Sequence, residues 1–324
     1  MKFRRVGDSG LVVSAIGFGC NNLGRPNSAT AEAGEAIRVV QAAVDAGITF
    51  FDTADTYGSS PGLSEQYLGE ALKPVRDQVI IGTKFGMDMR GANGMDFGAR
   101  GSRRYIVRAV EASLRRLDTE YIDLLQYHTP DNLTPVEETL AALDQLISDG
   151  KVRYIGHSNM SGWQMAQAHY VAKELGRERF ISAQNHYNLM DRRAELEVLP
   201  AAITFGMGVF PYFPLNNGLL TGKYRPDGGP EGSRLSYVRQ HMVTDADWNQ
   251  LSQYSNFAQE RGITEVEASF SWLASQQPVA SVIAGATRVA QVQQNARALE
   301  YEMNSQDLAI LDEIFPPADR VALF

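Results

Sequence analysis

The sequence predicts an α/β protein, a (β/α)8 barrel with an N-terminal β-hairpin and long loops at the C-terminal face of the barrel. Eight short apolar segments alternate with segments whose apolar residues recur at helical spacing. Most successive strand ends lie 26 to 32 residues apart, about the length of one βαβ unit. Because eight such units close a barrel and no linker or low-complexity tract interrupts the 324 residues, we expect one domain over 1–324.

The elements follow in order along the chain. Residues 2–6 and 11–13 predict a hairpin around the glycine-containing turn 7–10. The expected barrel strands are 15–19, 48–52, 79–84, 121–128, 152–159, 180–184, 208–212 and 279–285. Helical patterns are clearest at 33–47, 105–118 and 136–150, and Thr134, Pro135 and Glu137 predict a capping box before the third. The alternative, a doubly wound sheet, requires G-x-G-x-x-G after its first strand, which residues 17–24 (GFGCNNLG) do not supply.

Composition narrows the class of protein. The net charge is −8 and no basic run is present, so we expect neither a nucleic-acid nor a membrane partner. No stretch approaches 18 consecutive apolar residues, and the N-terminus lacks a secretory pattern. Cys20 is the only cysteine, which excludes an intrachain disulfide and favours a reducing, cytoplasmic location. The composition does not indicate an oligomeric state.

Two connections are longer than a βα unit needs. Residues 86–101 contain five glycines and no periodicity, and the segment 212–285 includes the polar, glycine-rich stretch 216–234. Long loops in compact domains are usually functional or disordered. Both follow strand ends, so we expect them on the face where barrels place their active sites.

Polar residues stand at the C-terminal ends of neighbouring strands. Asp52, Lys84 and His128 each follow an apolar run, and Tyr57 lies on the loop after Asp52. Singly, they could be a turn cap, a solvated lysine, a structural histidine and a rim aromatic; their convergence on one face of a barrel favours a site. A nearby ammonium lowers a phenol pKa, and a buried ammonium needs a carboxylate. The set therefore predicts an Asp–Lys–Tyr proton relay at a carbonyl oxygen, with hydride supplied by a cofactor.

Three motifs together carry a family resemblance. FFDTADTYG (50–58), LLQYHTPD (124–131) and GKVRYIGHSN (150–159) make the chain resemble the aldo-keto reductases over most of its length. The resemblance implies NADPH-dependent reduction of an aldehyde or ketone to an alcohol, or the reverse reaction. It implies a catalytic tetrad of Asp52, Tyr57, Lys84 and His128, with Tyr57 as general acid and His128 orienting the substrate. It also implies a small carbonyl compound or sugar as substrate.

The same resemblance implies a set of NADPH contacts. Ser158, Asn159 and Gln184 would hold the nicotinamide carboxamide, and Tyr212 would stack on the ring. Residues expected along the pyrophosphate and over the adenosine are Pro214, Leu215, Gly218, Lys223 and Arg234. A helix that begins after the last strand suits the adenosine 2′-phosphate. The residues expected there and at the adenine are Gly285, Thr287, Arg288, Gln291, Gln294 and Asn295.

Three positions depart from the family pattern. Phe213 stands where many relatives have serine, which removes one expected hydrogen bond to the pyrophosphate. Gln294 replaces a common glutamate beside the adenine. His157 replaces a residue that is more often apolar or cysteine, and we expect it to point into packing.

The substrate pocket is expected between Tyr57, the 86–101 loop, residues 188–192 and the C-terminal tail. Phe85 and Met87 would form an apolar wall. The arginines that could meet an anionic substrate are Arg90, Arg100 and Arg103.

Two other functions remain open. A metal-dependent hydrolase would use the strand-end histidines His128, His157 and His186, but the first strand lacks His-x-His and the last lacks a carboxylate. A cofactor-binding regulatory subunit of a membrane channel would keep the tetrad. Multiple turnover distinguishes that function from a reductase.

Overall fold

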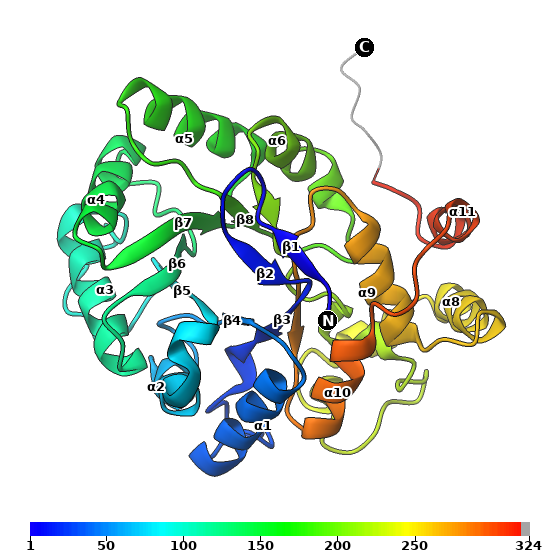
Figure 1. Cartoon of the computed structure of the whole chain (residues 1–324). Helices are drawn as coiled ribbons and strands as arrows, with labels where there is room; N and C mark the ends of the chain where they lie inside the picture. Colours follow the sequence, from blue (N-terminus) through cyan, green and yellow to red (C-terminus); the bar gives the residue numbers. More distant parts are fainter. Residues whose placement is uncertain (319–324) are drawn as a thin grey trace.

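The chain forms an eight-stranded parallel sheet curled into a barrel, with helices packed around the outside (Figure 1). The computed structural model describes residues 1–318, so the last residues of the expected pocket tail, 319–324, lie outside the described part. The strands are β1 (Phe3–Arg5), β2 (Val12–Ser14), β3 (Ile16–Gly19), β4 (Phe50–Asp52), β5 (Ile80–Phe85), β6 (Ile122–Tyr127), β7 (Val152–Ser158), β8 (Ser182–Gln184), β9 (Gly208–Val209) and β10 (Val282–Gly285). The α-helices are α1 (Ala33–Asp45), α2 (Leu63–Leu72), α3 (Arg103–Leu117), α4 (Val136–Ser148), α5 (Gly162–Glu174), α6 (Val198–Thr204), α7 (His241–Thr244), α8 (Trp248–Glu260), α9 (Glu265–Ser275), α10 (Val289–Arg297) and α11 (Ser305–Ile314). The 3-10 helices are η1 (Cys20–Asn22), η2 (Lys73–Gln78), η3 (Arg193–Glu195), η4 (Asn216–Thr221) and η5 (Arg234–Ser236).

The strand order confirms the predicted fold. The sheet runs β10-β3-β4-β5-β6-β7-β8-β9, with every neighbouring pair parallel. A parallel bridge between Val209 and Val279 joins the two end strands. Val209 N donates to the carbonyl of Pro278 at 3.0 Å and Ala280 N donates to the carbonyl of Val209 at 2.9 Å. The sheet therefore closes, and the strand ends converge on one face.

The N-terminal hairpin closes the opposite end of the barrel. β1 and β2 pair antiparallel, as predicted, and place Val6, Leu11 and Val13 inside. These three residues pack with Phe50 and Phe210 in a core cluster that is separate from the outer strand–helix core. Because this apolar cluster fills the end of the barrel at the strand N-termini, the face at the strand C-termini is the one open to ligands.

The regular part of strand β9 is shorter than predicted. The sequence favours a strand over 208–212, but regular pairing stops at Val209. Pro211 has no N–H to donate, so only its carbonyl takes part, accepting from Ile283 N at 3.3 Å. Tyr212 then leaves the sheet, although it still pairs with His186 through an isolated bridge.

The predicted capping box at Thr134 is wrong. Pro135 occupies the N-cap position of α4, and the Thr134 hydroxyl donates to Asp131 Oδ2 at 2.8 Å. Asp131 also accepts from the backbone N–H groups of Gly101, Leu133 and Thr134. One carboxylate therefore ties the end of the 86–101 loop to the start of α4, which a local helix-start pattern cannot reveal.

We expect Asp131→Ala to lower the free energy of unfolding by about 2 kcal/mol, because four donors lose their acceptor. Partial burial alone would raise the pKa of Asp131, but hydrogen bonds from Gly101 and Thr134 outweigh burial and lower it. Its contribution should therefore be complete above about pH 4 and disappear as the pH falls further. Thr134→Val is the control, with an expected loss under about 1 kcal/mol. Urea unfolding at pH 7 and pH 3 measures both, and equal losses in the two variants would contradict this account.

Candidate active site

A buried ion pair lies at the centre of the open face. Lys84, near the end of β5, donates from Nζ to Asp52 Oδ2 and to the carbonyl of Thr53, each at 2.7 Å. Lys84 is fully buried and Asp52 is 3% exposed. Adjacent strands carry the pair, because β4 and β5 run in parallel register with Asp52 opposite Gly82. The structure thus brings together the first two predicted tetrad residues.

Two amides satisfy the other oxygen of Asp52. Gln126 and Gln184 each donate from Nε2 to Asp52 Oδ1, at 3.1 Å and 2.9 Å. We had not singled out Gln126, although it stands two residues before His128 and so faces the same side of β6. The absence of a side chain at Gly156 makes room for it, since a Cβ there would lie 3.3 Å from Gln126 Cγ. Asp52 is therefore held by three neutral or cationic donors inside the barrel.

The lysine keeps its proton. Burial alone lowers the pKa of a lysine, but the Asp52 carboxylate, and after it Tyr57, outweigh burial and raise the pKa of Lys84 above its usual value. The structure confirms the predicted contact between the Lys84 ammonium and the Asp52 carboxylate. The Nζ atom lies 5.3 Å from the centre of the Tyr57 ring, so the fixed charge acts on the phenol.

The pKa of Tyr57 moves opposite to the expected direction. Lys84 does favour the phenolate, but burial is the larger effect and the net pKa of Tyr57 is raised. The prediction that the ammonium lowers this pKa below its usual value is therefore wrong. A raised pKa keeps Tyr57 protonated at neutral pH, the form that a general acid requires.

His128 completes the group as a neutral imidazole. Its ring packs edge-on against Tyr57, with centroids 5.9 Å apart. Burial, and then the Lys84 charge, lower the pKa of His128 to about 3. Its Nδ1 has no hydrogen-bond partner within residues 1–318. All four predicted catalytic residues therefore lie together at the strand ends.

The expected carboxamide residues form a connected platform beside this group. The Ser158 hydroxyl donates to the carbonyl of Gln184 at 2.7 Å, and Asn159 Nδ2 donates to the carbonyl of His128 at 2.9 Å. Tyr212 donates from its hydroxyl to Asn159 Oδ1 at 2.8 Å. Gln184 directs its amide at Asp52, as described above. The platform thus joins β6, β7 and β8 to the ring that is expected to stack on nicotinamide.

One face of Tyr212 is covered by His186. The two rings are stacked with centroids 5.4 Å apart and an interplanar angle of 6°. His186 Nδ1 lies 3.0 Å from Asp191 Oδ2, and its Nε2 lies 3.1 Å from Asn188 Nδ2. Because Asn188 donates through its amide, the imidazole proton is on Nδ1, toward Asp191. His186 therefore supports the stacking tyrosine, a role that the sequence did not indicate.

Arg234 lies near two other arginines, Arg25 and Arg239. The guanidinium carbons of Arg234 and Arg239 lie 5.3 Å and 5.7 Å from the centre of the Phe213 ring. Burial, and then the charges of Arg25 and Arg239, lower the pKa of Arg234 to about 10. Arg234 Nε is buried without a hydrogen-bond partner among the described residues, and no carboxylate is near enough to offset the repulsion. Unpaired like charges of this kind suit an anion.

The segment after β10 begins a helix as predicted. Arg288 is the N-cap of α10 and is exposed, and Thr287 donates from its backbone N–H and its hydroxyl to Gln291 Oε1. Gly285 and Gln294 are exposed, and Asn295 is buried. Lys223 is exposed beside Tyr224, and Gly218 lies in η4 with a positive φ of 103°. Pro214 is buried and Leu215 is half-buried at the start of the same loop.

Some expected pocket residues have other contacts. Phe85 is 1% exposed and stacks on Tyr127 in the outer core, so it does not form the apolar wall. Arg100 is paired with Asp96 and Asp88. Arg90 and Arg103 are exposed. His157 is fully buried against Phe180, and burial lowers its pKa to about 3, in agreement with its expected place in the packing.

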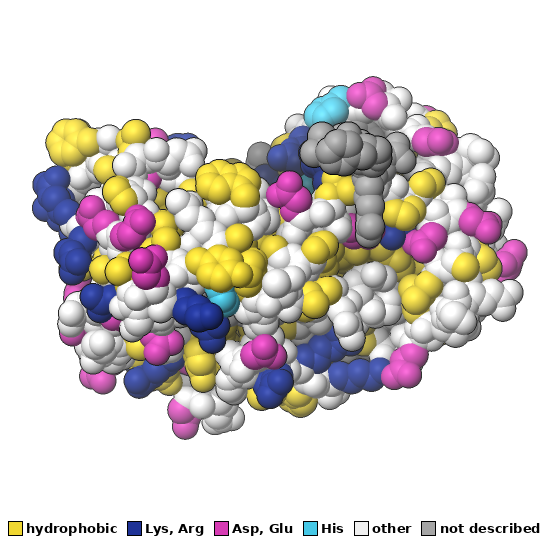
Figure 2. All heavy atoms as spheres, turned by 90° about the horizontal axis from the view of Figure 1, so that it is seen from above, with side chains coloured by type: hydrophobic (Ala, Val, Ile, Leu, Met, Phe, Trp, Pro, Cys, Tyr) yellow, Lys and Arg dark blue, Asp and Glu magenta, His cyan; other side chains and the backbone are white. Residues whose placement is uncertain are grey.

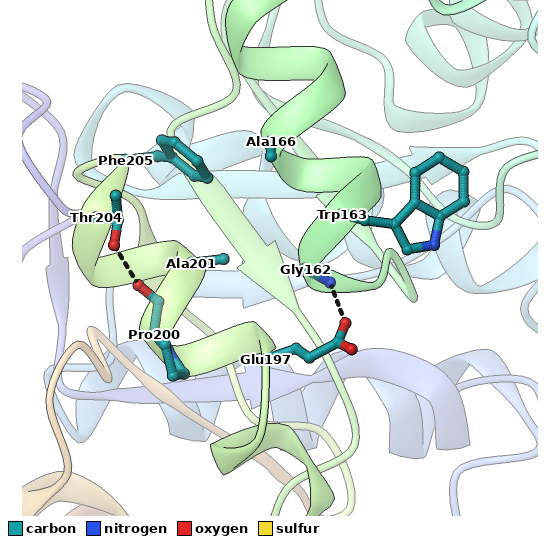
Figure 3. A pocket seen from close by; sticks show the side chains of 8 residues that line it. All are labelled: Gly162, Trp163, Ala166, Glu197, Pro200, Ala201, Thr204 and Phe205. Carbon is teal, nitrogen blue, oxygen red and sulfur yellow. Dashed lines mark hydrogen bonds between the residues drawn. The ribbon is translucent and has the colours of Figure 1, made fainter. Parts of the chain in front are cut away.

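A surface groove lies away from these residues. It encloses about 330 Å³ between α5 and α6, and its walls include Ala166, Pro200 and Phe205 (Figure 3). Glu197 accepts a hydrogen bond from Gly162 N, and Trp163 also lines the groove. Figure 2 looks onto this side of the barrel, where hydrophobic side chains are exposed near the middle of the face. None of the predicted site residues lines the groove.

Two further features concern the described residues as a whole. In 1–318, no three His, Cys, Asp or Glu side chains come together in a way that could hold a metal ion. No helix in the same range is both long and apolar enough to cross a membrane.

Comparison with known proteins agrees with the fold. The sequence profile of the aldo/keto reductase family matches residues 15–315. L-glyceraldehyde 3-phosphate reductase of Escherichia coli O157:H7 is 34% identical, covering 97% of this chain and 92% of its own length. Versiconal hemiacetal acetate reductase of Aspergillus parasiticus is 32% identical, with 98% of each chain covered. A probable voltage-gated potassium channel subunit beta of Oryza sativa subsp. japonica is 34% identical over 93% of this chain and 92% of its own.

The family profile over most of the chain, together with relatives named as reductases, supports an oxidoreductase. The chain belongs to the aldo/keto reductase family.

The contribution of the buried ion pair to stability can be tested by mutation. We expect Lys84→Met to lower the free energy of unfolding by about 3 kcal/mol, because Asp52 is left buried without its cation. The double variant Asp52→Asn with Lys84→Met should recover most of this loss, since no net charge then remains buried. Thermal unfolding measures both. Lys73→Met, which breaks an exposed pair with Asp118, is the control and should leave the stability nearly unchanged. A double variant no more stable than Lys84→Met would contradict this account.

Proposed function

We propose that the protein is an NADPH-dependent reductase that converts an aldehyde or ketone to an alcohol, with Tyr57 as general acid. The observation that carries this proposal is the buried Lys84 ammonium, which lies between the Asp52 carboxylate and the Tyr57 ring. Such an arrangement places one fixed positive charge beside a protonated phenol. In this environment a developing oxyanion is stabilised where it forms.

The roles of the side chains follow from their protonation states. Tyr57, protonated because its pKa is raised, donates its proton to the carbonyl oxygen as the alcohol forms. Lys84 stabilises the phenolate that remains, and Asp52 holds the ammonium in place. His128, neutral at physiological pH, can donate one hydrogen bond to the substrate oxygen and so orient it. The nicotinamide supplies the hydride when the cofactor is bound.

The residues present fit a dinucleotide phosphate. Arg234 has a buried Nε without a partner, and its guanidinium is repelled by Arg25 and Arg239. A pyrophosphate would offset this repulsion, and Arg234 Nε could donate to it in place of the hydroxyl that is missing because Phe213 stands where relatives have a serine. Arg288 at the start of α10 is exposed and would hold the adenosine 2′-phosphate. Tyr212 would stack on the nicotinamide ring with the face that His186 leaves open.

The substrate is proposed to be a small carbonyl compound or sugar. One relative is named for reduction of L-glyceraldehyde 3-phosphate and another for reduction of versiconal hemiacetal acetate. These names differ widely in size and charge, so they support the reaction class and leave the individual compound open. We propose a cytoplasmic location, consistent with the single, buried Cys20.

Tyr57→Phe should retain NADPH affinity and lose at least about 100-fold in kcat for aldehyde reduction, because the acidic proton is removed. Fluorescence titration measures binding, and absorbance at 340 nm measures turnover. Tyr170→Phe on the outer surface of α5 is the matched control and should behave as the wild type. Turnover by Tyr57→Phe at the wild-type rate on the same aldehyde would show that another group protonates the oxygen.

Arg288→Ala should weaken NADPH binding by about 10-fold and leave NADH binding nearly unchanged, because only NADPH carries the 2′-phosphate. Arg297→Ala, exposed near the other end of α10, is the control. Titration with both cofactors measures the effect. Equal weakening of NADPH and NADH would place Arg288 elsewhere than at the 2′-phosphate.

A second candidate function is a cofactor-binding subunit with little turnover. It is supported by the relative named as a probable potassium channel subunit beta. The two functions share the tetrad, so mutation of Tyr57 does not separate them. Tight NADPH binding without multiple turnover across a broad panel of carbonyl compounds would favour this candidate over a reductase.

A further inference from the structure

A polar network lies under the 86–101 loop, outside the tetrad. Between Met87 and Arg100 only Met89 and Asn93 are buried, with 1% and 6% of their surface exposed. Met89 can anchor the loop by apolar burial. A buried asparagine needs hydrogen-bond partners instead, and its partners show what it holds.

Asn93 bridges two elements of the site. Its Nδ2 donates to Asp55 Oδ2 at 3.3 Å, and its Oδ1 accepts from Arg116 Nη1 at 3.4 Å. Asp55 is fully buried in the loop between Asp52 and Tyr57. Its backbone N–H donates to the carbonyl of Lys84 at 3.1 Å. The side chain of Asn93 therefore contacts Asp55, which precedes Tyr57 by two residues in the same loop.

Arg116 connects the network to the barrel. It donates from Nε to Glu65 Oε2 at 2.6 Å, and Glu65 Oε1 accepts from the Thr83 hydroxyl at 2.5 Å. Glu65 and Thr83 are fully buried, and Thr83 directly precedes Lys84 on β5. Because the guanidinium is already neutralised by Glu65, it is a fixed donor for Asn93 and not a free cation.

The local sequence explains why this side chain points inward. Asn93 stands between Gly91 and Gly94, which have positive φ values of 82° and 83°. Ala92 and Asn93 therefore stand between two residues in the left-handed region, which glycine adopts without strain. The loop therefore turns at both sides of Asn93 and leaves its neighbours exposed. Met95 and Phe97 are 66% and 73% exposed.

We propose that Asn93 is a positioning residue that fixes the 86–101 loop against the Tyr57 segment and thereby sets how well large apolar carbonyl substrates bind. This role rests on the proposed reductase function. Asn93 does not touch the reacting atoms, and its effect passes through the loop. Loss of its two hydrogen bonds releases the loop between Met89 and Gly101 while the Asp52–Lys84 pair remains intact.

Asn93→Ala tests the role in catalysis. KM for 4-nitrobenzaldehyde should rise at least about fivefold, while kcat and the Kd for NADPH stay within about twofold of the wild type. The reason is that the loop would bind the substrate equally well in the ground state and in the transition state. KM for propanal, which is too small to need the loop, should change little. Asn249→Ala, an exposed asparagine on α8, is the matched control. A fall in kcat with unchanged KM would overturn the proposal.

A second measurement does not depend on activity. Trypsin should cut after the exposed Arg90 at least about fivefold faster in Asn93→Ala than in the wild type, with fragments identified by mass. Equal cleavage rates in Asn93→Ala and the wild type, at equal thermal stability, would show that Asn93 does not hold the loop. If the wild-type protein reduces neither aldehyde, the proposed function fails on this panel, and the cleavage rates still decide whether Asn93 holds the loop.

Exchange of the Asp55 and Asn93 side chains should restore the contact between them. Burial, and then the Glu65 charge, raise the pKa of Asp55 well above its usual value, so a neutral amide is tolerated at this position. In the double variant Asp55→Asn with Asn93→Asp, the amide at 55 donates to a carboxylate that also accepts from Arg116. This variant should recover slow cleavage and most of the substrate affinity. No recovery in a stably folded double variant would contradict the bridging geometry.

Discussion

The structure of the site depends on the buried ion pair between Lys84 and Asp52. An ammonium with no exposed surface would lose its proton unless a carboxylate stood beside it. Asp52 in turn would be costly to bury unless both of its oxygens were satisfied, and Lys84, Gln126 and Gln184 satisfy them. These groups project from different strands of one closed barrel, so moving any one of them breaks hydrogen bonds to Asp52. The positive charge is therefore fixed in space before any substrate arrives.

Burial acts in opposite directions on the two groups beside this charge. It raises the pKa of Tyr57 and lowers that of His128, so both are neutral at physiological pH. A site made this way presents two neutral hydrogen-bond donors and a single cation to a carbonyl oxygen. The ammonium does not create a phenolate in the resting protein. On the proposed function, its contribution comes when the proton leaves Tyr57 and negative charge develops next to it, which is the condition for stabilising a transition state more than a ground state.

The fold, and the meeting of Asp52, Lys84 and His128 on one face of the barrel, could be predicted because both depend on strand spacing. Parallel strands of a barrel end on one face, so polar residues that follow apolar runs must converge, whatever the loops do. The remainder depends on tertiary contacts between distant segments. A local pattern predicts a helix start at Thr134. In the structure the Thr134 hydroxyl donates instead to Asp131, which also accepts from the distant Gly101 N–H. The support of Tyr212 by His186 and the approach of Arg25 to Arg234 likewise join segments whose distance no periodicity encodes.

The two long loops at the open face are held by different kinds of interaction. The 86–101 loop is fastened by the hydrogen bonds of Asn93 with Asp55 and Arg116 and by the carboxylate of Asp131, which are satisfied without a ligand. The loop after β9 carries Arg234 and Arg239, which repel each other and Arg25 and have no carboxylate nearby within residues 1–318. On the proposed function, an anion is needed before that repulsion is relieved, whereas the 86–101 loop has its polar contacts already formed. This asymmetry favours an order of events in which the cofactor binds first and completes a pocket whose other side is preformed.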